Sequence, residues 1–306
     1  MGRVNLTPAL VNTPPLFPDF STLRLDLGDV QINTCIKGHG PPLLLLHGHP
    51  QTHAIWHRVA PTLALTHTVV MTDLRGYGDS SKPQGLPGHS NYAKRTMALD
   101  LVKVMKQLGF DAFDVLAHDR GARVAHRLAI DHPNRVKRLM LLDIAPTLAM
   151  YRQTDEVFAR SYWHWFFLIQ PSPMPERLIE CNPGAYIRDV MGNRSAGMTP
   201  FDPRAVQEYV RCLSLPGAAH GLCEDYRASS TIDLVHDQDS LNTGIKISHP
   251  LKVFWGVDGV IQKCFDPLRE WGQVASQASG KALPCGHYVP EEAPLELLEE
   301  CAVFFS

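Results

Sequence analysis

One pentapeptide constrains the fold of this chain more than any other segment. The residues AHDRG at 117–121 follow an apolar run at 113–117 and precede a stretch with helical spacing at 122–131. A strand, a tight turn and a helix in this order, with small residues on both sides of a central polar one, predict a sharp turn that projects the central side chain from the edge of a sheet. The sequence therefore predicts that Asp119 stands at this edge, where the helix N-terminus favours an anion.

Other segments extend this alternation of strands and helices. Apolar or β-rich runs predict further strands at 23–27, 31–36, 42–46, 68–72, 136–142 and 251–255, and helical spacing predicts further helices at 92–108, 266–274 and 295–305. The order favours a mostly parallel sheet with helices on both faces, the α/β class.

The pattern changes in the middle of the chain. From 147 to 227 the sequence is rich in aromatic residues, Met and Pro, with helical stretches and no alternating strands. We therefore expect three segments: the first part of an α/β core at 1–146, an inserted helical cap at 147–227 and the second part of the core at 228–306. A chain of 306 residues, 44% of them hydrophobic, is long enough to bury such a core.

Composition argues against several classes of partner. A formal net charge of -2 gives no attraction to nucleic acid or to an acidic membrane surface. The seven cysteines form no CxxC pair and are odd in number, which favours free thiols in a reducing compartment over disulfides or a zinc site. Residues 1–20 lack the apolar core of a signal peptide, and no run is long enough to span a membrane. The expected location is cytoplasmic, with no nucleic-acid or membrane partner and no metal.

An aspartate at the projecting position indicates a particular chemistry. A serine that displaced a leaving group from saturated carbon would form an ether, which water does not readily cleave. An aspartate forms an ester, which water can hydrolyse. Asp119 therefore points to substitution at carbon–halogen bonds or epoxides, whereas the plain alternative is an aspartate that caps a helix.

A base for the hydrolysis of such an ester is expected near the C-terminus. His287 lies in LPCGHY at 283–288, between an expected last strand and the last helix, so that it follows the nucleophile in the chain. Its predicted task is to deprotonate the attacking water. Asp143 and Asp258 each end a predicted strand, and both are candidates to orient this histidine.

The segment HGHP at 47–50 follows a predicted buried strand. We expect the backbone N–H groups of His49 and Arg120 to form an oxyanion hole for the ester oxygen. The plain alternative is a simple turn after a strand.

Seven segments together resemble haloacetate (fluoroacetate) dehalogenases of the α/β-hydrolase superfamily. They are HGHPQTH, DLRGYGDSSKP, HDRGARVAHRLAIDHP, LLDIAPT, YWHWFFLIQPSPMPE, EDYRASSTID and LPCGHYVPEEAP, spread over most of the chain after about residue 30. DLRGYGDS is common in the fold, whereas HDRGAR together with YWHW is much more restrictive. The resemblance implies the α/β-hydrolase fold with a helical cap, and it favours Asp143 over Asp258 as the acid.

The resemblance also implies roles for residues in the pocket. Arg120 and Arg123 correspond to the pair that holds the substrate carboxylate, and guanidinium groups match a carboxylate well. The halide pocket corresponds to three hydrogen-bond donors of the cap, His164, Trp165 and Tyr226. The implied substrate is a small anionic halogenated acid, with no metal or organic cofactor, and relatives are commonly homodimers.

The expected reaction converts fluoroacetate or chloroacetate to glycolate and halide, through an ester on Asp119 that His287-activated water hydrolyses. The sequence departs from the family where His49 replaces a frequent Phe, where the segment 189–194 lacks a Trp, and where Asp258 is acidic. Two alternatives stay open. One is an epoxide hydrolase, for which the candidate proton donors in the cap are Tyr162, Tyr186, Tyr209 and Tyr226. The other is a non-catalytic binding protein of the hydrolase fold.

Overall fold

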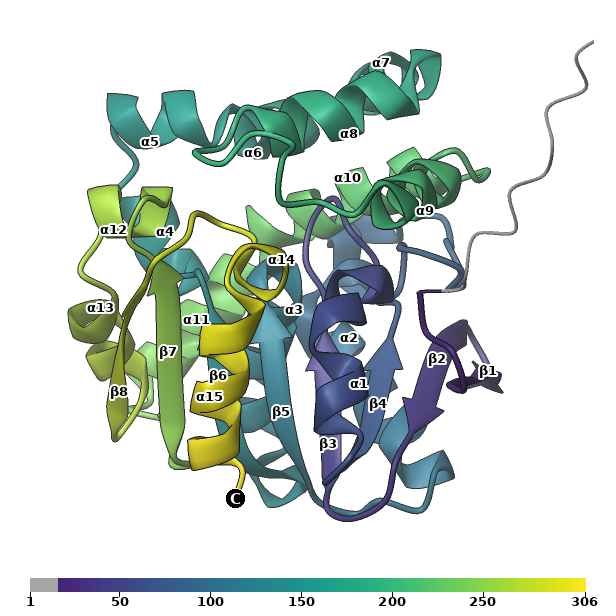
Figure 1. Ribbon diagram of the computed structural model, residues 1–306. Coiled ribbons are helices and arrows are strands. Elements are labelled where there is room, and N and C mark those ends of the chain that lie inside the picture. The colour runs from purple at the N-terminus through teal and green to yellow at the C-terminus, as the bar shows by residue number, and fades with distance from the viewer. Residues whose placement is uncertain (1–15) are drawn as a thin grey trace, which may run out of the picture.

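An eight-stranded sheet forms the centre of the computed structural model, which describes residues 16–306 (Figure 1). In sheet order the strands are β1 (Ser21–Asp26), β2 (Gln31–Lys37), β4 (Thr68–Thr72), β3 (Pro42–Leu46), β5 (Phe113–His118), β6 (Val136–Leu142), β7 (Leu251–Gly256) and β8 (Ala278–Leu283). The β1–β2 and β2–β4 pairs are antiparallel, and every other pair is parallel. The predicted α/β class with a mostly parallel sheet is confirmed.

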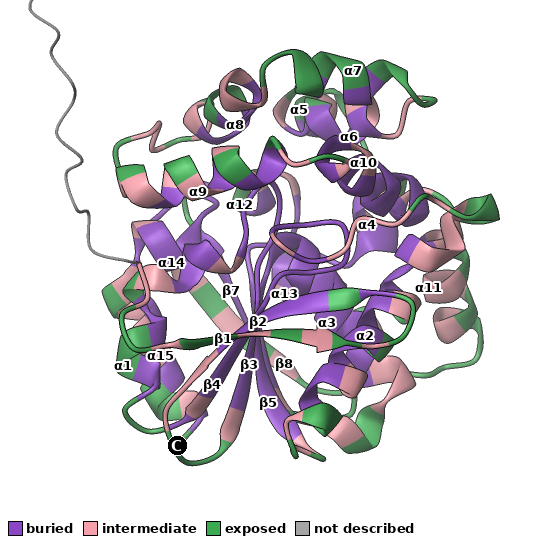
Figure 2. Ribbon diagram, turned by 90° about the vertical axis from the view of Figure 1, so that its right-hand side faces the viewer, coloured by how far each residue is buried: buried purple, intermediate pink, exposed green. Residues whose placement is uncertain are grey.

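The inner strands are apolar throughout because helices cover both of their faces. In β3, Leu44 and Leu46 pack into one hydrophobic cluster while Leu43 and Leu45 pack into the other, as the two-residue period of a strand requires. The helices α2 (Lys94–Gln107), α3 (Asp119–Asp131) and α13 (Pro267–Val274) contribute to the first cluster. The second cluster contains residues of the 3-10 helix η1 (His53–Arg58) and of the helices α1 (Ala60–Leu63) and α15 (Pro294–Phe304). Figure 2 shows the inner strands buried, whereas α1, α2 and α15 carry exposed residues on their outer sides.

A long helical insertion separates β6 from β7. It consists of α4 (Thr147–Arg152), α5 (Glu156–Ser161), α6 (Trp163–Leu168), α7 (Met174–Cys181), α8 (Pro183–Gly192), α9 (Pro203–Leu213), α10 (Ala218–Ser229) and α11 (Ile232–Asn242). Helices α5 to α10 lie above the carboxyl ends of the strands, whereas α4 and α11 lie beside the sheet (Figure 1). The expected end of the cap at residue 227 falls inside α10.

Short helices complete the described chain. They are η2 (Pro87–Tyr92) and η3 (Pro133–Arg135) in the first part of the core, and α12 (Val260–Cys264) and α14 (Val289–Glu292) in the second. All seven cysteines are free thiols, as predicted. Within residues 16–306, no helix combines the length and the apolar character needed to cross a membrane. The expected absence of a signal peptide concerns residues 1–20, and residues 1–15 of these lie outside the described part of the chain.

Candidate active site

The turn between β5 and α3 is tighter than the sequence predicts. Strand β5 ends at His118, and α3 begins at Asp119 itself, three residues before the predicted start. Asp119 has a φ of 43°, in the left-handed region that non-glycine residues seldom adopt. Gly121 makes this turn possible, because a Cβ at this position would lie 2.4 Å from the carbonyl oxygen of His47. Such strained backbone is typical of functional sites.

The loop after β3 meets Asp119 directly. A Cβ on Gly48 would lie 2.5 Å from the Cβ of Asp119, so only glycine fits between the two loops. The backbone N–H of His49 donates a hydrogen bond of 2.9 Å to Asp119 Oδ1. Among the described residues, no group donates a hydrogen bond to Oδ2 of the same carboxylate. One oxygen of Asp119 is therefore held and the other is free to react.

Asp119 is ionised although it is only 3% exposed. Burial alone would raise the pKa of its carboxyl group, but electrostatic interactions with His287 and Arg123 hold this pKa well below its usual range. An anionic carboxylate in a dry pocket is a strong nucleophile, because little water needs to be removed before it reacts.

His287 and Asp143 form a buried pair beside this carboxylate. Asp143 Oδ2 lies 2.5 Å from His287 Nδ1, and Asp143 Oδ1 accepts a hydrogen bond of 2.9 Å from the backbone N–H of Gly256. An ionised Asp143 places a proton on Nδ1, which leaves Nε2 able to accept a proton from water. Asp258 is exposed and forms no hydrogen bond with His287. Of the two candidate acids, the geometry brings Asp143 to the histidine.

His118 contacts the loop that carries His287, a role that the sequence analysis missed. Its Nε2 lies 2.8 Å from the carbonyl oxygen of His287, and the two rings are 4.8 Å apart. Burial lowers the pKa of His118 to about 3, so that it is neutral and can donate from Nε2. Its place just before Asp119 is the only sequence signal for this contact.

The two arginines of α3 are buried, and each is largely engaged by the protein. Arg120 Nε donates to Asp225 Oδ2 at 2.7 Å, and its Nη2 donates to Ser229 Oγ at 2.9 Å. Arg123 Nη1 donates to Thr147 Oγ1 at 3.0 Å. Each keeps one buried nitrogen without a partner, Nη1 of Arg120 and Nε of Arg123. Both guanidinium groups were expected to bind the substrate carboxylate. In the structure, only one nitrogen of each has no protein partner and stays available for that contact.

Asp225 is a second residue that the sequence analysis missed. It is fully buried on α10, where it pairs with Arg120 and Lys94 and accepts a hydrogen bond of 2.6 Å from Tyr77. Burial would raise the pKa of its carboxyl group, but the two cations hold this pKa well below its usual range. Its position next to Tyr226 in EDYR was the available signal, although nothing in the sequence connects it to Arg120.

The three expected halide-binding residues come together above the arginines. The ring of Tyr226 lies 6.0 Å from that of His164 and 6.2 Å from that of Trp165. Tyr226 OH and Trp165 Nε1 are buried donors without a partner. Burial lowers the pKa of His164 well below its usual range, so this ring is neutral. Arg120 and Arg123 pack on the faces of Tyr226 and Trp165, at 4.1 and 4.7 Å from their centroids.

The other candidate tyrosines have different surroundings. Tyr186 OH lies 3.1 Å from His49 Nε2, and Tyr162 packs edge-on to His287 with 6.3 Å between the ring centroids. Tyr209 points elsewhere, into a buried cluster in which its OH donates to Glu291 Oε1 at 3.1 Å. Gln51 donates to the other oxygen of Glu291. Burial raises the pKa of Glu291 to about 8.

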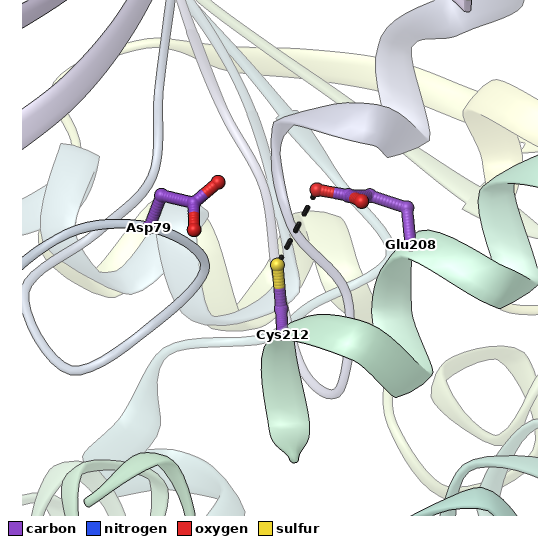
Figure 3. A group of neighbouring side chains, drawn as sticks. All are labelled: Asp79, Glu208 and Cys212. Carbon is purple, nitrogen blue, oxygen red and sulfur yellow. Dashed lines mark hydrogen bonds between the residues drawn. The ribbon is translucent and has the colours of Figure 1, made fainter. Parts of the chain in front are cut away.

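A group of side chains away from the site has the composition of a metal site. Asp79, Glu208 and Cys212 lie close together (Figure 3). Arg211 already supplies the cation there, since its Nη2 lies 2.6 Å from an oxygen of each carboxylate and 3.1 Å from the sulfur. This cluster is therefore an ion-pair network.

The chain is similar in sequence to known proteins. A family model described as alpha/beta hydrolase fold matches residues 41–172. A fluoroacetate dehalogenase from a Burkholderia species is 44% identical over 280 residues, which cover 91% of this chain and 91% of that protein. A soluble epoxide hydrolase from a Corynebacterium species is 34% identical over 274 residues, or 88% of this chain and 91% of that protein.

Solved structures resemble the chain over nearly its whole length. The crystal structure of an α/β-hydrolase from Nostoc has 53% sequence identity and a TM-score of 0.90, with 94% of this chain and 98% of that chain covered.

Proposed function

The chain belongs to the haloacetate (fluoroacetate) dehalogenase family of α/β-hydrolases, and on this premise we propose that it releases halide from a haloacetate through a covalent ester on Asp119. The observation that carries the proposal is the arrangement around Asp119. One carboxylate oxygen accepts from His49 N–H, the other is free, and the His287–Asp143 pair lies beside it.

Substrate binding relies on the two free guanidinium donors. Nη1 of Arg120 and Nε of Arg123 are buried and unpartnered, which is costly until an acceptor arrives. A haloacetate carboxylate supplies that acceptor in charge-assisted hydrogen bonds. The Asp225 carboxylate fixes Arg120 in place, so that binding needs little reorganisation.

Carbon–halogen cleavage follows from this placement. Asp119 Oδ2 attacks the α-carbon in line, the carbon–oxygen bond forms, and the halide departs with the electron pair of the carbon–halogen bond. Tyr226 OH and Trp165 Nε1, both without a protein partner, donate to the departing halide together with neutral His164. Preorganised donors in a dry site stabilise such a developing charge strongly.

Hydrolysis of the ester regenerates the enzyme. His287 Nε2 accepts a proton from water, whose oxygen then adds to Cγ of Asp119, and the imidazolium is stabilised by Asp143. The oxyanion forms on Oδ1, to which the N–H of His49 already donates. The backbone N–H of Arg120, the other expected donor, belongs to the same turn. The Cγ–Oδ2 bond then breaks, the departing alkoxide takes the proton from the imidazolium to give glycolate, and the acid formed on Asp119 releases one proton, so that the carboxylate returns.

The test is to trap the ester. Replacing His287 with Asn removes the base but keeps Asp119, so chloroacetate should leave a carboxymethyl group on the peptide that contains Asp119, detected by mass spectrometry. The matched control is the double variant with Asp119→Asn, which should stay unmodified. Continued catalytic chloride release by His287→Asn with an unmodified peptide would refute the mechanism.

An epoxide hydrolase is the second candidate, favoured by the unpartnered hydroxyl of Tyr226 and by the similarity to the Corynebacterium protein. Epoxide opening requires an acid to protonate the ring oxygen, and a buried tyrosine can serve. Turnover of styrene oxide should be measured beside chloride release from chloroacetate at equal enzyme concentration. The larger kcat/KM identifies the activity, and binding of both compounds without turnover would indicate a non-catalytic protein.

A further inference from the structure

A cavity of about 290 Å³ opens onto His287 from the cap side. Its wall includes Asn193, Arg194 and Ser195 from the cap, and Gly259 and Lys263 from the core. A Cβ on Gly286 would lie 2.2 Å from Ser195 Oγ, so the cap segment 193–195 packs directly against the residue before His287. Neither Asp119 nor the arginines of α3 line this cavity, so it is additional to the pocket proposed for the two-carbon acid, and His287 lies beside both.

Arg194 supplies a cation to this cavity. Its Cζ lies 4.6 Å above the ring of Tyr162, which in turn packs 5.4 Å from His164 and 6.3 Å from His287. The side chain is half-buried and forms no ion pair with any carboxylate in the described part of the chain. Arg120, by contrast, is neutralised by Asp225. The carboxylates of Asp119 and Asp143 act on Arg194 through space without forming an ion pair with it, so that a bound anion can still pair with this half-buried guanidinium.

The other charges on the wall largely cancel. Lys263 and Asp258 have opposite signs, and both are exposed at the rim. Among the side chains of this wall, Arg194 therefore supplies the inner positive charge, which favours an anionic group.

The stereochemistry of the displacement directs one substituent to this cavity. Around the α-carbon, the carboxylate points to Arg120 and Arg123, and the halogen points to the donors of the halide pocket. Two positions remain on that carbon, one for hydrogen and one for a further substituent, and in one of the two enantiomers this substituent takes the position nearer His287, onto which the cavity opens.

We propose that Arg194 binds a second anionic group on the α-carbon, so that 2-halodicarboxylates of the 2-chlorosuccinate type are substrates. This inference rests on the proposed function. The chemistry stays balanced, because Asp119 forms the ester as chloride leaves with its bonding electrons. One water then gives the 2-hydroxydicarboxylate and one proton.

The experiment compares 2-chlorosuccinate with 2-chlorobutyrate, which has the same carbon skeleton without the second carboxylate. Each enantiomer is assayed for chloride release, with chloroacetate in parallel. The kcat/KM ratio of chlorosuccinate to chlorobutyrate should fall about 10- to 100-fold in Arg194→Gln, the loss expected for a charged hydrogen-bonded contact. Arg194→Lys should recover part of the ratio. Arg188→Gln removes an exposed charge from α8 and should leave the ratio unchanged.

A binding measurement separates this inference from the mechanism. Succinate, which cannot react, should bind about 10- to 100-fold more weakly to Arg194→Gln than to the parent by calorimetry, whereas butyrate should show a smaller loss. The inference is overturned if the parent hydrolyses chloroacetate but not 2-chlorosuccinate, or if Arg194→Gln reduces both four-carbon substrates equally. If chloroacetate itself is not hydrolysed, the proposed function falls, and the succinate measurement alone decides the role of Arg194.

Discussion

Removal of the Tyr226 hydroxyl is the sharpest test of the halide pocket. In the free protein this hydroxyl is buried and has no hydrogen-bond partner. Tyr226→Phe therefore removes no protein contact, and the free energy of unfolding should stay the same or rise by about 1 kcal/mol. In the transition state the hydroxyl donates to a departing halide, and a hydrogen bond to a charged group contributes about 1.5–3 kcal/mol. The expected loss in kcat is about 10- to 150-fold.

The assay measures halide release with an ion-selective electrode for fluoroacetate and chloroacetate, together with thermal unfolding. The loss should be larger for fluoroacetate, because the charge on a departing fluoride is more concentrated. The contrasting variant is Tyr209→Phe, whose hydroxyl donates to Glu291 and whose loss should lower stability much more than rate. Full fluoroacetate turnover by Tyr226→Phe, or a clear loss of its stability, would refute this reasoning.

Three further predictions follow from buried charges. Asp143→Asn should slow turnover by at least about 100-fold, as expected for a group that orients a catalytic histidine. Asp258→Asn should leave turnover unchanged. Steady-state chloride release measures both variants. Asp225→Asn leaves Arg120 without its counter-charge and should cost about 3–5 kcal/mol in a denaturant titration. The pKa of Glu291 is raised from 4.5 to about 8 in the folded protein, so its contribution to stability is complete below pH 4.5 and is lost as the pH rises to 8. Glu291→Gln should flatten that decline in melting temperature.

The fold was largely predictable because its signals are local. The strands β3, β4 and β6 have the predicted bounds, since runs of branched or aliphatic residues between turn residues have few alternative structures. Strand β8 has no such run, because it lies at the sheet edge and its side chains are mostly exposed or half-buried. Helix α3 begins at Asp119 and not at the predicted residue 122, because the turn before it is so tight.

The site was predictable where a motif has local geometry and unpredictable where distant side chains meet. The positions of Asp119 and His287 follow from the strand–turn–helix order and from a Gly-His pair near the C-terminus. The pairing of Arg120 with Asp225 joins residues 105 positions apart, and no period or spacing encodes it. Arg194 stood in a segment noted only for lacking a tryptophan. Its side chain becomes informative only when the cap is folded over His287.

The hydrogen bond from His49 N–H to Asp119 Oδ1 gives the two oxygens of that carboxylate different fates during turnover. In the proposed cycle, Oδ2 departs as the hydroxyl oxygen of the product, and the oxygen of water takes its place, while Oδ1 stays for the life of the enzyme. Each product molecule thus carries the oxygen taken up in the previous cycle. In heavy-oxygen water, the first product released by each enzyme molecule should be unlabelled, and every later one should be labelled.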